Sequence, residues 1–477
     1  MRYETVVGLE IHVELSTKSK IYCSCSTQFG SEANTQICPV CVGMPGALPV
    51  LNKSVVEYAV RAGIATNCSI TEYSKQDRKN YFYPDLPKAY QISQFDLPIC
   101  TGGYVDIDTD GGKKRIGITR IHIEEDAGKL IHDTKEDCSL IDYNRAGIPL
   151  IEIVSEPDIS SPLEAKMFVE ELKAIIEYIG VSDCKMQEGS FRVDVNISVR
   201  PKGEQDLGVR TEMKNLNSIR TIMRAIEGER TRQIKVLTDG DEVFQETRRW
   251  DEQKGGSYPL RSKGEARDYR FFAEPDLMPI VVDQSWKDEI KNTLPELPEA
   301  RRRRFVKQFA IPEYDALIIT GSRPLADFFE EAVQKSKNAK AVSNLIMGEL
   351  LRLLKDKDIC EDEIPLSASN LAKLVNLVDE GVISITMAKR IFEKMFESNK
   401  DPKIIVKEEG LFVVNDKKSL DEIVTRVISK NPELVEDYRA GKTKVFGFLV
   451  GQAMKESKGK AEPRIINEIL KAKLKGI

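Results

Sequence analysis

The pattern of hydrophobic and polar positions divides the chain of 477 residues into two parts near residue 295. Before that point, short runs of alternating apolar and polar residues are separated by Gly, Pro, Asn and Asp, which is typical of β-strands joined by turns. The predicted strands are Thr5–Glu14, Arg115–Glu124, Leu150–Val154 and Phe191–Val199, and helices are predicted at Pro162–Ile179 and Ser218–Leu237. This part is therefore predicted to be a domain that mixes strands and helices.

After residue 295, apolar residues recur at spacings of three and four, which predicts helices almost throughout. The predicted helices are Leu325–Lys335, Ala341–Lys355, Ser369–Glu380, Thr386–Glu397, Ser419–Asn431, Lys444–Lys455 and Pro463–Lys475. Proline-containing segments at Leu294–Pro298 and Asn399–Pro402 mark the boundaries. The predicted fold class is α+β, with a mixed-sheet domain at 1–294 followed by two all-helical domains at 295–402 and 403–477.

Composition and charge narrow the class of protein. Hydrophobic residues make up 41% and charged residues 31%, as in soluble globular proteins. No stretch approaches the roughly 20 apolar residues that span a bilayer, and the first residues do not resemble a signal peptide. We therefore expect a cytoplasmic protein with no membrane contact.

The net charge of −5 argues against general binding to nucleic acid. Residues 441–477 nevertheless contain nine Lys or Arg and three Glu, so this segment carries 9 − 3 = +6. A basic terminus on an acidic protein favours one local contact with a polyanion, although a solvated helical face explains the charge equally well.

Four of the nine cysteines lie close together, as Cys23, Cys25, Cys38 and Cys41. Two short arms, each with two thiolates, can surround one tetrahedral zinc ion, whereas four unrelated structural cysteines are the alternative. Four protein ligands leave no open position on the metal. The expected role of the zinc is therefore structural, within an insertion of the first domain.

Acidic residues alternate with apolar ones along the first predicted strand. Glu10, His12 and Glu14 share one of its faces, a pattern that a solvent-exposed strand would also show. Other predicted strands carry further carboxylates at Glu124, Glu125, Glu152 and Asp194. Because neighbouring carboxylates repel one another, their recurrence on several strands favours a hard cation such as Mg²⁺, which prefers oxygen ligands.

Polar clusters further along the chain supply donors of the kind that bind phosphate. The candidate phosphate-binding residues in these clusters are Lys214, Asn215, Arg248 and Arg270. The sequence contains no Walker P-loop and no dinucleotide-binding glycine motif. From the residues alone, the prediction is a metal-dependent phosphate chemistry of unspecified class.

Several long runs of uncommon composition carry a resemblance that extends over the whole chain. These runs are Val7–Leu15, Asp77–Asp85, Pro87–Gln94, His122–Lys129, Pro149–Asp158, Lys214–Ser218, Tyr269–Asp276 and Gly447–Gln452. Together they resemble the B-subunit family of bacterial and organellar glutamyl/aspartyl-tRNA amidotransferases.

The resemblance implies that the first domain is a cradle for the acceptor end of a mischarged tRNA, either Glu-tRNA(Gln) or Asp-tRNA(Asn). ATP and Mg²⁺ would phosphorylate the side-chain carboxylate of the attached amino acid, and ammonia would then displace phosphate. The helical domains would contact the tRNA body. The resemblance assigns catalytic roles to Glu10, His12, Glu124, Glu125, Glu152, Asp194 and Lys79, magnesium to Glu10, His12 and Glu125, and zinc to Cys23, Cys25, Cys38 and Cys41.

The source of ammonia points to partner subunits. The chain has only three histidines and shows no Cys–His pair or Ser/Lys amidase arrangement, so it is expected to lack a glutaminase. The resemblance implies an amidase-type A subunit and a small C subunit. The alternatives are a non-enzymatic, zinc-stabilised RNA-binding or assembly protein, and the archaeal E-type relative, whose extra domain would hardly fit within 477 residues.

Overall fold

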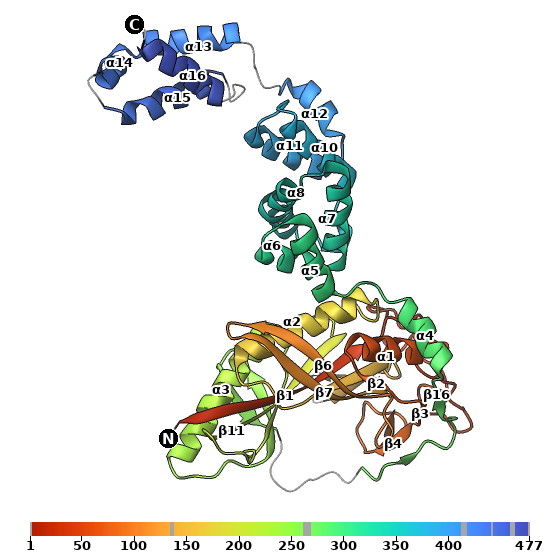
Figure 1. The fold of residues 1–477 in the computed structure, drawn as a ribbon. Helices are drawn as coiled ribbons and strands as arrows, with labels where there is room; N and C mark the ends of the chain where they lie inside the picture. The colour runs from red at the N-terminus through yellow and green to blue at the C-terminus, as the bar shows by residue number, and fades with distance from the viewer. Residues whose placement is uncertain are drawn as a thin grey trace. The chain divides into compact units, whose positions relative to one another are not determined.

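The computed structural model describes residues 2–133, 138–260, 269–411, 417–439, 442–457 and 463–475. The chain forms two compact units, Met1–Pro298 and Glu299–Ile477. The first unit combines a mixed sheet with helices and the second is helical (Figure 1), so the predicted α+β class is confirmed. The predicted division of the helical part at residue 402 stays a prediction.

A nine-stranded sheet organises the first unit, in the order β14-β13-β12-β11-β1-β10-β7-β6-β2. Its strands are β1 (Tyr3–Glu14), β2 (Ser69–Ile70), β6 (Cys100–Thr109), β7 (Gly112–Glu125), β10 (Pro149–Ser155), β11 (Phe191–Pro201), β12 (Thr211–Lys214), β13 (Glu246–Asp251) and β14 (Gly256–Pro259). All neighbours are antiparallel except β12 and β13, which are parallel. All four predicted strands belong to this sheet, and the first of them, β1, lies at its centre.

Three smaller sheets complete the strands described in the first unit. β3 (Tyr73–Ser74) pairs with β16 (Ile280–Val281), and β8 (Lys129–Asp133) forms a hairpin with β9 (Cys138–Asp142). The third sheet contains β4 (Asp77–Asn80), β5 (Tyr90–Ser93) and β15 (Phe272–Ala273). The pairings of β3 with β16 and of β4 with β15 bring segments about two hundred residues apart in sequence into contact.

The alternation along β1 separates a hydrophobic face from a polar one. Val7, Leu9, Ile11 and Val13 are fully buried in one core with helices α1 (Lys53–Ala65), α2 (Pro162–Tyr178) and α3 (Ile219–Thr238). Helix α4 (Gln284–Asn292) packs against α1. Both predicted helices begin at serine N-caps, Ser161 for α2 and Ser218 for α3, whose hydroxyls accept backbone N–H bonds.

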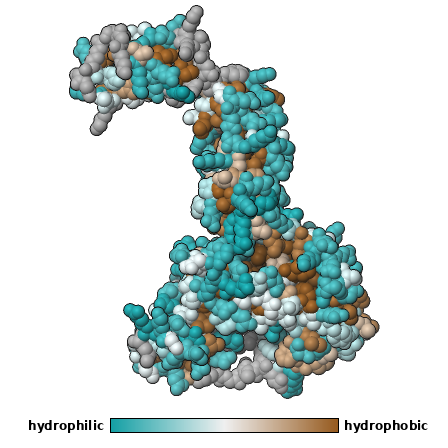
Figure 2. Space-filling view, viewed as in Figure 1, coloured by the Kyte–Doolittle hydropathy of each residue, from teal (hydrophilic) through white to brown (hydrophobic). Residues whose placement is uncertain are grey.

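The second unit contains α-helices with two short irregular turns. Its helices are α5 (Pro298–Phe309), α6 (Glu313–Thr320), α7 (Arg323–Ser336), α8 (Ala339–Leu345), α9 (Leu351–Asp356), α10 (Ala368–Asp379), α11 (Ile385–Ser398), α12 (Pro402–Glu409), α13 (Lys417–Lys430), α14 (Pro432–Arg439), α15 (Lys444–Glu456) and α16 (Pro463–Lys475). A π-helical turn at Ile346–Leu350 separates α8 from α9, and a 3₁₀ turn lies at Glu361–Glu363. Hydrophilic side chains cover most of the visible surface of this unit (Figure 2).

Helices α13 to α16 share a hydrophobic core that includes Leu420, Val424, Leu449 and Leu470. Part of the basic charge of this segment is already paired, because Lys473 lies 2.7 Å from Asp421 and Lys442 lies 2.8 Å from Asp437. Lys458, Lys460 and Glu462 of the predicted basic tail lie outside the described residues. Among the helices that the structure describes, none is long and apolar enough to cross a membrane.

One buried carboxylate connects α3 to the edge of the large sheet. Glu229 is 1% exposed and accepts hydrogen bonds from Arg232 and Gln233 of its own helix at 2.6 to 2.9 Å. Ser257 of β14 also donates to it, and the Nε of Arg248 on β13 lies 3.7 Å away. Arg248 is itself 8% exposed and pairs directly with Glu246 at 2.6 Å, so Glu229 chiefly joins Arg232 and Gln233 of α3 to Ser257 of β14.

We expect Glu229→Ala to lower the free energy of unfolding by about 2 kcal/mol or more, because it removes the buried acceptor of Arg232, Gln233 and Ser257 and leaves these donors unsatisfied. The matched control is Glu227→Ala on the same helix, where an exposed carboxylate is removed and a change below about 0.5 kcal/mol is expected. Urea denaturation followed by tryptophan fluorescence measures the difference, since both tryptophans, Trp250 and Trp286, lie in the first unit. Equal losses in the two variants would contradict this role.

Candidate active site

The register of β1 brings the predicted acidic residues together on the polar face of the sheet. His12 lies directly opposite Glu152 of β10, and Glu10 lies opposite Asp194 of β11. Glu152 in turn lies opposite His122 of β7. Side chains that face each other across antiparallel strands are in contact range. Carboxylates from four separate sequence motifs thus converge on one surface.

One candidate ligand group consists of His12, Glu124 and Glu152, hereafter the His12 group, with one potential ligand atom of each within 4.8 Å of the others. The Nε2 of His12 lies 3.4 Å from Glu152 Oε2 and 3.6 Å from Glu124 Oε1. His122 joins this group, with its Nε2 3.3 Å from Glu152 Oε2. The sequence prediction assigned no role to His122, although its alternation with Glu124 repeats the pattern of Glu10 and His12.

Electrostatics in the His12 group favour protonated imidazoles beside an ionised Glu152. Burial alone would lower the pKa of His12, but the hydrogen bond and charge of Glu152 outweigh it, so the pKa is raised. The same balance raises the pKa of His122 to about 9. The two imidazoles outweigh the burial of Glu152 and hold its pKa well below its usual range. A divalent cation bound here would replace these protons.

A second candidate ligand group, the Glu10 group, consists of Glu10, Asp194 and Glu212, again with one oxygen of each within 4.8 Å. Lys214 Nζ lies 2.6 Å from Asp194 Oδ2 and 2.8 Å from Glu212 Oε1, and Asn196 donates to Glu10 Oε1 at 2.9 Å. Burial raises the pKa of Glu10, and the negative charge of Glu152 adds to the effect. Three carboxylates beside one ammonium form an oxygen-rich site suited to Mg²⁺.

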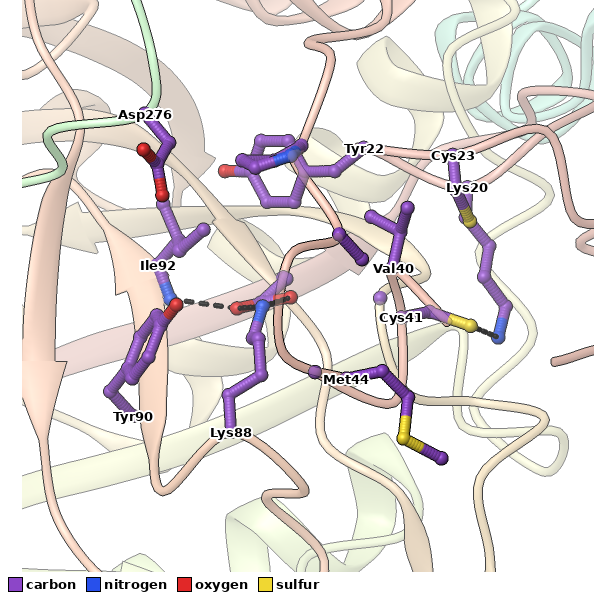
Figure 3. A pocket seen from close by; sticks show the side chains of 15 residues that line it. Lys20, Tyr22, Cys23, Val40, Cys41, Met44, Lys88, Tyr90, Ile92 and Asp276 are labelled. Carbon is purple, nitrogen blue, oxygen red and sulfur yellow. Dashed lines mark hydrogen bonds and ion pairs between the residues drawn. The ribbon is translucent and has the colours of Figure 1, made fainter. Parts of the chain in front are cut away.

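The structure places Glu125 away from both groups. It follows Glu124 in β7, so its side chain points to the other side of the strand, where it pairs with Lys88 and accepts a hydrogen bond from Ile92 N at 2.8 Å. Glu125, Lys88 and Tyr22 line a pocket of about 120 Å³ (Figure 3). The expected magnesium set of Glu10, His12 and Glu125 is therefore not brought together, because each belongs to a different cluster.

The predicted phosphate-binding residues also lie in different parts of the first unit. Lys214 lies on the polar face, whereas the adjacent Asn215 donates its amide to the backbone oxygen of Trp250 at 3.1 Å. Arg248 lies on the opposite face, hydrogen-bonded to Glu246 and Ser257 and close to α3. The exposed arginine that shares the polar face with Lys214 is its partner in register, Arg249. Arg249 rather than Arg248 therefore lies on the face of the carboxylate groups, and the phosphate contacts of the four residues stay a prediction.

Lys79 and Arg270 belong to the region of the small three-stranded sheet. Lys79 of β4 lies with its Nζ 5.0 Å from the ring centroid of Tyr269 and 5.9 Å from that of Tyr81. Arg270 has a left-handed backbone with φ of 46°, and its carbonyl oxygen accepts a hydrogen bond from Asn80. This small sheet is separate from the nine-stranded sheet that carries the His12 group and the Glu10 group.

The four predicted zinc ligands do come together. The sulfur atoms of Cys23, Cys25, Cys38 and Cys41 all lie within 4.8 Å of one another, and those of Cys38 and Cys41 are 3.9 Å apart. Zn–S bonds of about 2.3 Å in a tetrahedron place sulfur atoms about 3.8 Å apart, so the arrangement fits zinc. The pKa of Cys41 is lowered to about 5, chiefly by its hydrogen bond with Cys23. The same hydrogen bond raises the pKa of Cys23, so Cys41 is the member of this pair that ionises first.

At the end of β1, a buried ion cluster continues the polar face. Glu14 shares a hydrogen bond with Asp126, whose carboxylate lies 2.9 Å from Arg192 Nη2. Burial, followed by the charge of Asp126, raises the pKa of Glu14 to about 9. The positive charges of Arg192 and Arg145 outweigh burial and lower the pKa of Asp126 to about 2. Glu14 is therefore the protonated member of the pair at neutral pH.

Two family models and the full-length relatives indicate the same protein family for this chain. The family model of the GatB/GatE catalytic domain matches residues 5–288, and that of the GatB domain matches residues 327–474. The chain is 60% identical over 480 residues to the B subunit of the aspartyl/glutamyl-tRNA(Asn/Gln) amidotransferase of Caldicellulosiruptor bescii, with 100% of both chains covered. The corresponding protein of Carboxydothermus hydrogenoformans is 54% identical over 475 residues, covering 99% of each chain.

We expect Glu14→Gln to stabilise the protein increasingly as pH rises from about 4.5 to about 9. Folding raises the pKa of Glu14. The contribution of its protonated carboxyl to the stability of the protein is therefore fully present below the unfolded pKa, and it is progressively lost as pH rises toward the folded pKa. Glutamine does not ionise and escapes this loss, which amounts to up to about 3 kcal/mol at pH 7. Urea denaturation of both proteins at pH 5 and pH 8.5 in Mg²⁺-free buffer measures the effect. A pH-independent difference would refute the assignment.

Proposed function

The chain belongs to the B-subunit family of the aspartyl/glutamyl-tRNA(Asn/Gln) amidotransferases, and on this basis we propose how its polar face acts in the reaction. The first unit phosphorylates the side-chain carboxylate of the amino acid on Glu-tRNA(Gln) or Asp-tRNA(Asn), using ATP, and then converts it to an amide. The observation that carries this proposal is the convergence of the His12 group and the Glu10 group on one face of one sheet.

The proposed reaction consists of two substitutions. An oxygen of the substrate carboxylate attacks the γ-phosphorus of ATP, the bond to the bridging oxygen breaks, and ADP leaves. The nitrogen of ammonia then attacks the carbonyl carbon of the acyl phosphate, the C–O bond breaks, and inorganic phosphate leaves with the electron pair. Loss of a proton from nitrogen gives the amide. Both steps need groups that neutralise phosphate charge and hold it in line.

The chain offers such groups side by side. Magnesium would be held by the carboxylates of the Glu10 group and by the His12 group, where it would neutralise phosphate oxygens. Lys214 lies beside the Glu10 group, and the exposed Arg249 is next to it in register, so both can contact a phosphate. Because Lys214 is already paired with Asp194 and Glu212, its position is fixed before a substrate arrives.

Other features of the proposal lie outside this face. The cysteine cluster would hold zinc in a structural role, because four thiolates leave no open position. An amidase-type A subunit would supply ammonia, and a small C subunit would complete the complex. The basic helices α15 and α16 would contact the phosphate backbone of the tRNA. A non-enzymatic RNA-binding protein would not need the His12 group and the Glu10 group side by side on one face of a sheet. The enzymatic function is therefore favoured.

We expect Glu10→Gln, assayed in the purified complex, to lower the rate of amidation of mischarged tRNA by about 100-fold or more, because it removes a carboxylate that would hold the magnesium ion against the phosphates. Glutamine hydrolysis by the complex, measured separately, reports whether assembly survives. The matched control is Glu4→Gln, which removes a carboxylate of the same strand that pairs with Arg200. Amidation at the normal rate in the Glu10 variant would overturn the proposed site.

A further inference from the structure

A buried lysine contacts the cysteine cluster. Lys20 is 0% exposed, although lysine is almost never fully buried without a partner of opposite charge. Its Nζ lies 3.7 Å from the sulfur of Cys41 (Figure 3) and 3.3 Å from the carbonyl oxygen of Tyr143. Within the described part of the chain, no carboxylate lies at ion-pair distance from Lys20. Among the described residues, the candidate anions beside this ammonium are therefore the thiolates.

Lys20 also contacts the first arm of the cluster. Its backbone N–H donates to the carbonyl oxygen of Cys25 at 2.9 Å, while its side chain reaches Cys41 on the second arm. Cys41 is the most buried of the four cysteines and also accepts a hydrogen bond from the backbone N–H of Cys38 at 3.2 Å. The least hydrated sulfur is thus the one that receives two donors.

The charges explain this arrangement. Four thiolates around one divalent ion carry a net charge of −2, which is unfavourable in a buried site without a nearby cation. An isolated ammonium in the interior is unfavourable for the same reason. Placed together, the two compensate each other, and the N–H···S contact reduces the charge on the sulfur.

We propose that Lys20 is the outer-sphere cation of the zinc site and sets its affinity for metal. The proposal rests on the zinc site of the proposed function but not on the amidation reaction. Outer-sphere partners of metal ligands commonly change metal affinity by 10- to 100-fold. Since Lys20 also binds the carbonyl of Tyr143, it joins the metal cluster to the segment that leads into β10, the strand of Glu152.

The test uses the full chain purified with its accompanying subunits. Lys20→Met should lower zinc affinity by 10- to 100-fold in competition with a chelator, while Lys18→Met, which removes an exposed lysine two residues away, should leave it unchanged. In the Co²⁺-substituted protein, loss of the ammonium raises the energy of the sulfur electrons. The sulfur-to-cobalt charge-transfer band should therefore move to longer wavelength in Lys20→Met but not in Lys18→Met.

The outcomes separate the two proposals. A wild-type protein that holds no zinc would overturn the zinc site and the role of Lys20 with it. Bound zinc with unchanged affinity and an unchanged cobalt spectrum in a folded Lys20→Met variant would overturn only the role of Lys20. If that variant does not fold, acetylation of the wild-type protein gives the answer, because Lys20 should react faster after zinc removal. Equal reactivity with and without zinc would then overturn the proposal.

Discussion

The antiparallel pairing of β1 with β10 on one side and β11 on the other determines how the acidic and histidine side chains of the polar face meet. Its register places His12 between Glu152 and Arg192, and Glu10 next to Asp194. Because side chains alternate along a strand, a slip of one residue would turn the whole acidic row toward α1, α2 and α3 and expose the apolar row instead. Packing of the apolar residues against these helices therefore fixes which residues form the polar face. The same register determines both the hydrophobic core and the site.

The end of β7 shows how this alternation divides neighbouring residues between two environments. Glu124 belongs to the His12 group, whereas Glu125, the next residue, pairs with Lys88 in the pocket shown in Figure 3. Asp126 then pairs with Arg192, which lies opposite His12 in the register. Three consecutive acids thus have three different partners, and together these contacts hold one stretch of backbone between the polar face and the pocket.

The sequence was sufficient for features that depend on local pattern. Alternation identified β1, β7, β10 and β11, and the serine caps marked the beginnings of α2 and α3. The partners across strands could not be predicted, because register depends on contacts between distant segments. Without a predicted strand at β13, nothing indicated that Arg249 rather than Arg248 would share a face with Lys214. The π-helical turn at Ile346–Leu350 was equally hidden, since it interrupts a continuous helical pattern.

Charge counts distinguish the two ligand groups on the polar face. In the His12 group, the charges of Glu124 and Glu152 are matched by His12 and His122 when both imidazoles are protonated, so a cation must displace protons to bind. In the Glu10 group, three carboxylates face the single ammonium of Lys214, which leaves a charge of −3 + 1 = −2 when all are ionised. One divalent cation balances that charge without displacing a histidine proton. Cation binding to the Glu10 group would therefore depend on pH through Glu10, whose pKa is raised, whereas the His12 group would bind a cation in exchange for histidine protons.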